Sequence, residues 1–247
     1  GNPLNIETLP LVTPEMIASF WHSLAHRRID DVFATAPRLT YDEHSRLVLF
    51  SDLHRGDSGR ADAFAPNHAL FLHALGHYWR QGYSYVEAGD GDELWKNRHF
   101  ASIRRAHGPV FDLLHRFYGE ARLHLLTGNH DADGAATRDG LPLSEGLVLR
   151  RRYSGQELLI MHGHQADFKN DRLGAALRFF VQHFWRHLQS RGLRNTLPEA
   201  SQLPGAGRLM RQVAQWAQAN QGAIERKLLG WAQARGQGLI CGHTHRP

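Results

Sequence analysis

Five short blocks of the sequence hold residue types that bind metal ions, and each follows an apolar run typical of a β-strand. The blocks are residues 51–54 (SDLH), 89–93 (GDGDE), 128–131 (GNHD), 162–164 (HGH) and 242–245 (GHTH). In open α/β sheets, ligand-binding side chains follow the C-terminal ends of strands. If five strand ends converge on one edge of a sheet, their carboxylate, amide and imidazole groups are numerous enough to hold two metal ions.

Asp90 is the residue around which the other blocks can be placed. It follows the strand formers of residues 83–86 (YSYV), and Gly89 and Gly91 on either side of it end the strand. An isolated Asp at such a position is more often a helix N-cap. The four other blocks favour the ligand role, because they supply the partners that a metal ion needs. In the first of them Asp52 and His54 are two residues apart, so both can point toward one ion if the chain is extended there.

In order and identity, the blocks resemble the signature of the calcineurin-like metallophosphoesterase superfamily, D-x-H, G-D-x-x-D, G-N-H-D/E, H and G-H-x-H. The resemblance covers about residues 48–245. It implies two metal sites that share Asp90, since one carboxylate has two oxygens with which to bridge two cations. One ion would be held by Asp52, His54, Asp90 and His245, and the other by Asp90, Asn129, His162 and His243.

The same resemblance implies that His130 is not a ligand and that it faces the substrate as general acid or electrostatic stabiliser. Family members orient this histidine with an Asp three residues after the bridging Asp. This chain has Glu93 there, one methylene longer, and Asp92 is the alternative partner. Asn129, as a neutral oxygen donor, would bind metal and bear part of the charge that develops on the substrate.

Two further residues are candidate substrate contacts. Arg55 follows the first block and could contact a phosphate, with a surface arginine as the alternative. His164 lies where the related UDP-2,3-diacylglucosamine hydrolases carry an acidic residue. That branch has Arg at the position of His130, so the similarity to it is distant.

The implied activity is hydrolysis of a phosphomonoester, phosphodiester or pyrophosphate bond by a hydroxide that bridges two metal ions. Manganese is the expected metal, and iron or zinc suits the same nitrogen and oxygen ligands. The implied fold is a four-layer α/β/β/α sandwich of mixed sheets. Family members continue after the last block with strands that complete the second sheet, whereas this sequence ends at Pro247.

Composition is that of a globular protein with one large core. The 247 residues are 42% hydrophobic and 21% charged, and no apolar run approaches the roughly 18 residues of a membrane span. The single cysteine, Cys241, excludes an intrachain disulfide and is expected to be a small buried core residue. We therefore expect a cytoplasmic protein, with peripheral membrane contact as an option.

The net charge of +5 allows a nucleic-acid partner, because basic surfaces neutralise phosphates. The only basic triplet, residues 150–152, lies between two strand-like runs and is expected to be a solvated hairpin face. A small or lipid-linked phosphate compound is therefore favoured over nucleic acid. A nuclease remains the alternative enzyme, and a metal-binding scaffold without catalysis the alternative to an enzyme. Against the scaffold, none of the family's ligands is missing.

The expected elements alternate between strand and helix around the blocks. A helix starts after the N-cap Thr13, and a second, residues 66–81, buries Leu70, Ala74 and either His77 or Tyr78. A third helix is expected over residues 99–118. Strands are expected at residues 47–50, 83–88, 122–126 and 239–241, with a hairpin of residues 147–152 and 157–161.

Three parts of the chain follow from this pattern. Residues 1–46 form an N-terminal helical extension, residues 47–167 and 237–247 form the core, and residues 168–236 form a helical insertion with two apolar stripes. The UDP-2,3-diacylglucosamine hydrolases are similar here, with a helical lid that accepts acyl chains. Two helices that only pack on the core are the alternative.

Overall fold

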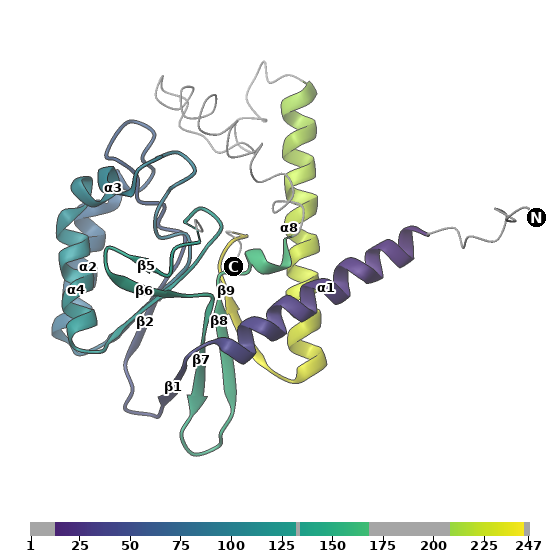
Figure 1. Ribbon diagram of the computed structural model, residues 1–247, viewed down its shortest axis with the longest axis horizontal. Coiled ribbons are helices and arrows are strands. Elements are labelled where there is room, and N and C mark those ends of the chain that lie inside the picture. The colour runs from purple at the N-terminus through teal and green to yellow at the C-terminus, as the bar shows by residue number, and fades with distance from the viewer. Residues whose placement is uncertain (1–12, 132–133, 168–207, 245–247) are drawn as a thin grey trace, which may run out of the picture.

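The computed structural model describes residues 13–131, 134–167 and 208–244. In these residues two mixed β-sheets lie side by side, with helices on their outer sides (Figure 1). The predicted α/β class is confirmed at this level. The residues of the fifth block beyond Thr244, including His245, and residues 168–207 of the insertion lie outside the described parts.

The larger sheet has five strands, of which four are parallel. Its order is β2 (Leu47–Phe50), β3 (Ser84–Ala88), β4 (Leu123–Leu126), β6 (Leu141–Ser144) and β5 (Thr137–Arg138). Only β5 runs antiparallel to its neighbour. Because β2, β3 and β4 are parallel neighbours, their C-terminal ends meet at the same edge.

The smaller sheet has four strands of mixed direction. Its order is β1 (Arg38–Tyr41), β7 (Gly146–Arg151), β8 (Glu157–Met161) and β9 (Gly238–Cys241). The predicted hairpin is β7 and β8, which are antiparallel, and β9 is parallel to β8. Strand β1 pairs with β7 and comes from the segment expected to be only helical. Sequence patterns did not predict β1, β5 or β6. Strand β5 has only two residues, and β6 contains Pro142, which is rare inside strands.

The helices are grouped on the outer sides of the sheets (Figure 1). On the larger sheet lie α2 (His68–Arg80), α3 (Phe100–Ala106) and α4 (Gly108–Gly119), preceded by the short 3-10 helix η2 (Ala65–Asn67). On the smaller sheet lie α1 (Pro14–Thr35) and α8 (Arg208–Arg235), with η3 (His164–Ala166). In the described chain no helix has both the length and the apolar character needed to cross a membrane.

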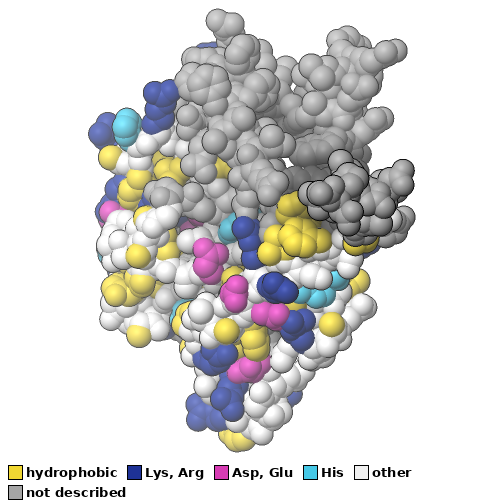
Figure 2. Space-filling model, turned by 45° about the vertical axis from the view of Figure 1, so that its right-hand side comes forward, with side chains coloured by type: hydrophobic (Ala, Val, Ile, Leu, Met, Phe, Trp, Pro, Cys, Tyr) yellow, Lys and Arg dark blue, Asp and Glu magenta, His cyan; other side chains and the backbone are white. Residues whose placement is uncertain are grey.

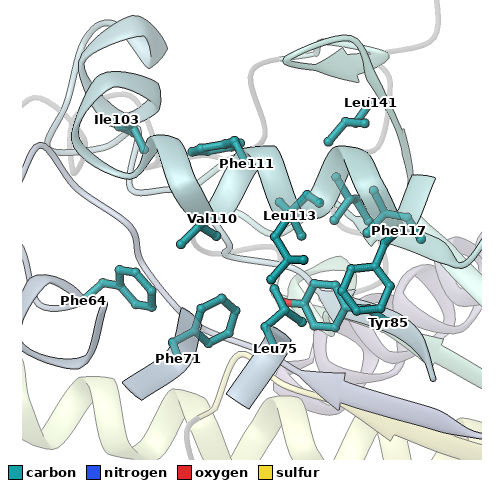
Figure 3. Close-up of a cluster of buried hydrophobic side chains, with 13 residues drawn as sticks. Phe64, Phe71, Leu75, Tyr85, Ile103, Val110, Phe111, Leu113, Phe117 and Leu141 are labelled. Carbon is teal, nitrogen blue, oxygen red and sulfur yellow. The ribbon is translucent and has the colours of Figure 1, made fainter. Parts of the chain in front are cut away.

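Alternation of side chains along the strands divides the hydrophobic residues among three clusters. In β3, Tyr85 faces α2 and α4 (Figure 3), whereas Val86 faces the other sheet. In β7, Leu147 faces the larger sheet, whereas Val148 packs against α1 and α8. Successive strand residues point to opposite faces, so both faces of each sheet are buried.

Two helix predictions differ from the structure. The expected helix over residues 99–118 is two helices, because Pro109 starts a new helix after a break at His107. In α2 the buried residues are Phe71 and Leu75, four residues apart, so Leu70 is turned away from the core and is 71% exposed.

Cys241 is exposed, and its expected place in the core is wrong. It ends β9, which is the last strand of the smaller sheet in the described chain, so no neighbouring strand covers it on that side.

The described half of the insertion is the single helix α8. Its side chains Ile224, Leu228 and Trp231 are buried with α1 against the smaller sheet. This part of the insertion packs on the core, a contact that a lid and a helix that only packs on the core would share, so the choice between these two alternatives stays a prediction. The first apolar stripe lies outside the described residues.

Asp62 connects the loop after β2 to the junction of α3 and α4. Its carboxylate accepts hydrogen bonds from the backbone N–H groups of Ser58 (2.8 Å), Phe64 (2.9 Å) and Ala65 (3.1 Å), and from His107 Nε2 (2.9 Å). Burial raises the pKa of Asp62, but the hydrogen bonds from His107 and Ser58 outweigh it and hold the pKa below its ordinary value.

We expect Asp62→Asn to lower the free energy of unfolding by about 1–3 kcal/mol at neutral pH, since buried donors lose their acceptor. The folded-state pKa of Asp62 is depressed, so its stabilisation is present above the unfolded pKa of about 4 and is lost as pH falls further. The measurement is urea unfolding of both proteins between pH 7 and pH 3.

The control is Asp112→Asn, because Asp112 is exposed and pairs only at the surface with Arg104. It should change stability by less than about 0.5 kcal/mol. A difference between Asp62→Asn and the unchanged protein that stays constant down to pH 3 would contradict the role of the Asp62 charge.

Candidate metal centre

Residues of all five blocks lie in the space where the two sheets meet. Asp52, Asp90 and Asn129 follow β2, β3 and β4 of the larger sheet, whereas His162 and His243 follow β8 and β9 of the smaller one. The expected single sheet edge is therefore wrong, and the ligands come from two sheets. Burying the Val86 and Leu147 faces together brings these two edges into contact.

Asp90 belongs to both groups of described side chains whose ligand atoms are close enough to share a metal ion. One group is His54, Asp90 and His130, and the other is Asp52, Asp90 and His162. The predicted sharing of Asp90 by two metal sites fits this arrangement. The prediction that Asp52 and His54 bind the same ion does not fit it, because Asp52 lies in one group and His54 in the other.

The backbone explains this separation. Asp52 has φ 56° and His54 has φ 51°, so the chain turns at both residues and is not extended as expected. Asp90 (φ 52°) and His243 (φ 69°) are also left-handed, which makes four of the seven described non-glycine residues with positive φ candidate ligands. Such conformations cost about 1–3 kcal/mol each and cluster at functional sites.

Glycines allow the loops to approach one another closely. A Cβ atom on Gly128 would lie 2.1 Å from Asp90 Oδ1, and one on Gly242 would lie 2.5 Å from Asp52 Oδ2. Both distances are far below van der Waals contact, so a side chain at either position would displace a candidate ligand. The glycines of the GNHD and GHTH blocks are thus required for packing.

His162 is held in the tautomer that a metal ligand needs. Its Nδ1 donates to the carbonyl of Ala88 (3.0 Å), so its Nε2 faces Asp90 Oδ2 (3.2 Å) and Asn129 Oδ1 (3.2 Å). Three atoms with lone pairs therefore converge, and they require a positive charge between them, from a proton or a bound cation. Burial lowers the pKa of His162, but Asp90 outweighs it and raises the pKa to about 9.

His130 is fixed on three sides. Its Nδ1 donates to Glu93 Oε1 (2.8 Å), its ring stacks on Trp95 with centroids 4.2 Å apart, and the edge of His54 lies 4.7 Å away. Its backbone N–H donates to Asp90 Oδ1 (2.7 Å). Burial lowers the pKa of His130, but Glu93 and Asp90 outweigh it and raise the pKa.

The structure places Glu93, and not Asp92, against His130. Glu93 also lies 3.4 Å from His54 Nδ1 and 3.6 Å from Lys96 Nζ, so its buried charge is balanced by two imidazoles and an ammonium group. Burial raises the pKa of Glu93, but the charge of His130 outweighs it and leaves the pKa well below its ordinary value. Asp92 is buried and accepts a hydrogen bond from Arg55 Nε instead (2.8 Å).

Arg55 is neither a substrate contact nor a surface arginine, and both expectations for it are wrong. It is 1% exposed, and its guanidinium makes two parallel bonds of 2.7 Å to Glu87 besides the one to Asp92. Three of its five N–H groups make these bonds, and the buried side chain presents no surface to a phosphate. Its backbone N–H and C=O bind Gly91 O and Glu93 N, both at 2.9 Å, so Arg55 fastens the first block to the second.

The remaining histidines surround the second group. His164 lies beside His162, with ring centroids 5.6 Å apart, and its Nδ1 has no hydrogen-bond partner among the described residues. Burial, then His162 and His243, lower the pKa of His164 to about 3. His243 Nε2 lies 3.4 Å from Asp167 Oδ2. His164 therefore lies near the candidate metal centre, as expected of a substrate contact, but its side chain is largely enclosed by protein.

Sequence patterns missed three residues of this site. Trp95 stacks on His130 and donates from Nε1 to Asn129 O (2.7 Å). Asp131 accepts from the backbone N–H groups of Gly128 (2.6 Å) and Gly91 (2.9 Å), joining two blocks, and burial and nearby carboxylates raise its pKa to about 7. Asp167 lies three residues after His164, but an Asp at that spacing carries no signal by itself.

Comparison of the chain with family models, curated proteins and solved structures finds no match. The site must therefore be interpreted from its own geometry. That geometry places one further carboxylate, an amide and three imidazoles near Asp90, a donor set suited to manganese, iron or zinc.

We expect Arg55→Met to lower the free energy of unfolding by about 3–5 kcal/mol, because it leaves the buried carboxylates of Glu87 and Asp92 without their cation. Chemical unfolding measures this loss. Arg105→Met is the control, since Arg105 is exposed on α3 and should stay within about 0.5 kcal/mol. Equal stability of the two variants would show that the ion pairs do not fasten the loops.

Proposed function

We propose that this chain is a dinuclear metal-dependent phosphoesterase that hydrolyses an ester or pyrophosphate bond of a small or lipid-linked phosphate compound. The observation that carries the proposal is the convergence of ligand atoms on Asp90, with Asp52 and His162 in one group and His54 in the other. Beside them lies His130, whose ring Glu93 orients. The resemblance of the five ordered blocks to the calcineurin-like metallophosphoesterases supports the same function. His245, beyond the described residues, would be the further ligand of the His54 group.

The proposed architecture is the four-layer α/β/β/α sandwich of that family. It is supported by the three hydrophobic clusters, one between the sheets and one under each group of helices. We also propose a cytoplasmic location, which the single cysteine supports.

The donor set fits the implied ions, and each residue then has a distinct task. Bound divalent cations would lower the pKa of water and neutralise charge on the phosphate oxygens. Asp90 Oδ2 lies 3.2 Å from His162 Nε2 and 3.9 Å from His54 Nε2, so one carboxylate oxygen is directed to both ligand groups. Asn129 adds an oxygen without adding negative charge that would repel a phosphate.

His130 is proposed as the general acid. Since Glu93 occupies its Nδ1, the proton that it transfers to the leaving oxygen must come from Nε2. Glu93 stabilises the protonated ring, and Trp95 keeps it from rotating. The ring position therefore depends on residues that bind neither substrate nor metal.

The basic triplet gives the nuclease alternative no support. Residues 150–152 are exposed at the turn between β7 and β8, whereas His162 follows the opposite end of β8. Five residues of strand span roughly 16 Å. Figure 2 shows one group of Lys and Arg side chains at the lower end of the face in view and others scattered above it, without a continuous basic stripe.

We expect purified protein to contain about two equivalents of transition metal. Asp90→Asn should lower that content and abolish hydrolysis of bis(p-nitrophenyl) phosphate, because both ligand groups include Asp90. Elemental analysis and absorbance assays measure the two effects, with Asp112→Asn as the control. Full activity of chelated, metal-free protein would refute the mechanism.

We expect His130→Ala to keep its metal content and to lose roughly 10²–10⁴ in turnover on esters with poor leaving groups. The loss should be much smaller for nitrophenyl esters, since nitrophenolate needs no proton. His99→Ala, at an exposed position, is the control. A fall in metal content would assign His130 as a ligand beside His54, and equal losses on both ester types would exclude the acid role.

A further inference from the structure

A pocket of about 570 Å³ opens between α2 and the end of β2. Its walls are mostly apolar. They include Phe50 from β2, Phe64 from the loop between β2 and η2, and Phe71 and Tyr78 from α2. Phe64 and Phe71 lie edge to face, 5.3 Å apart, at the margin of the hydrophobic cluster under the helices (Figure 3). The volume is within the range of small-molecule sites.

The mouth of the pocket carries apolar side chains where a solvent-facing helix surface would ordinarily be polar. Leu70 lines the pocket although it is 71% exposed, and Ala74 follows one turn later along α2. A single exposed leucine does not by itself indicate a binding site. Here it extends an apolar wall outward, so that a ligand would cover it.

Asp52 connects this pocket with the candidate metal centre. It lines the pocket, and it also belongs to the ligand group with Asp90 and His162. A compound whose phosphate lies at that group would therefore have an apolar pocket within reach of its substituents. The described residues that line the pocket all belong to the core, and none of them lies on α8.

Resting on the proposed function, we propose that this pocket binds an apolar group, an alkyl chain or an aromatic ring, of the phosphate-ester substrate. Asn67 adds a single amide to the lining, and no Lys, Arg or Glu is among the described residues that line the pocket, so these residues offer a sugar or a second phosphate little to bind. The substrate class is thus a phosphate ester with a hydrophobic substituent. This places the apolar group against α2, and not against the helical insertion.

The test uses p-nitrophenyl alkyl phosphate diesters with chains from methyl to octyl, in which nitrophenolate leaves and the alkyl chain remains on the phosphate. The kcat/KM of the unchanged protein should rise by up to about fourfold per methylene, equivalent to about 0.8 kcal/mol each, until the pocket is full. Ala74→Trp fills the pocket and should stop the rise after the shortest chains. Leu70→Glu should make kcat/KM nearly independent of chain length, because it places a charge at the mouth of the pocket.

Leu229→Glu is the matched control, because Leu229 is 57% exposed on α8 and is not part of the pocket. It should keep the full chain-length dependence. Since Leu70 and Leu229 are both exposed, neither variant should lose more than about 0.5 kcal/mol of stability, and this keeps the test valid if Ala74→Trp fails to fold. A dependence that survives in Leu70→Glu and is lost in Leu229→Glu would overturn the proposal.

Calorimetric binding of alkylphosphonates, which the enzyme cannot hydrolyse, separates this proposal from the proposed function. Chain-length-dependent affinity that is lost in Leu70→Glu would support the pocket even if no diester is hydrolysed, in which case only the phosphoesterase proposal fails. Affinity and kcat/KM that do not depend on chain length would overturn the pocket proposal, whether or not hydrolysis occurs.

Discussion

The burial of Asp90 is the constraint on which the rest of the site depends. Its carboxylate is 2% exposed and faces imidazole nitrogen and amide oxygen, so it is stable only with positive charge beside it. Burial raises the pKa of Asp90, but His162, and to a lesser degree His130 and His54, outweigh it and keep it well below its ordinary value. A bound cation would take over the part that these protonated rings play.

The neighbouring carboxylates are balanced in different ways, and the difference separates structural from chemical roles. Arg55 pairs with both Glu87 and Asp92, and Arg138 Nε lies 3.9 Å from Asp92 Oδ2, so these two acids are balanced by guanidinium groups, which keep their protons. Glu93 lies beside the imidazoles of His130 and His54, which can gain and lose protons, and also pairs with Lys96. Asp92 and Glu93 are adjacent in sequence, yet Asp92 supports the fold and Glu93 supports the proposed proton transfer.

Much of the site could be predicted because its signals are local. The strand before each block is visible in a few residues, and a short polar segment after it is typical of a ligand-bearing turn. The Glu93 alternative could be stated but not decided, since both Glu93 and Asp92 follow Asp90 on the same turn. Arg55 was misassigned because burial of a charge depends on partners 32 and 37 residues away.

The sequence by itself determined the α/β alternation around the five blocks and the types of donor atom, because these depend on periodicity and chemical identity. It did not predict β1, β5 and β6 or the break between α3 and α4. Only the tertiary structure decided that the ligands come from two sheets, that the left-handed turns at Asp52 and His54 direct them into different groups, and that Arg55 is buried. These properties arise from contacts between segments distant in sequence. Packing of the two sheet faces against each other brings those segments together, and no local pattern records which faces meet.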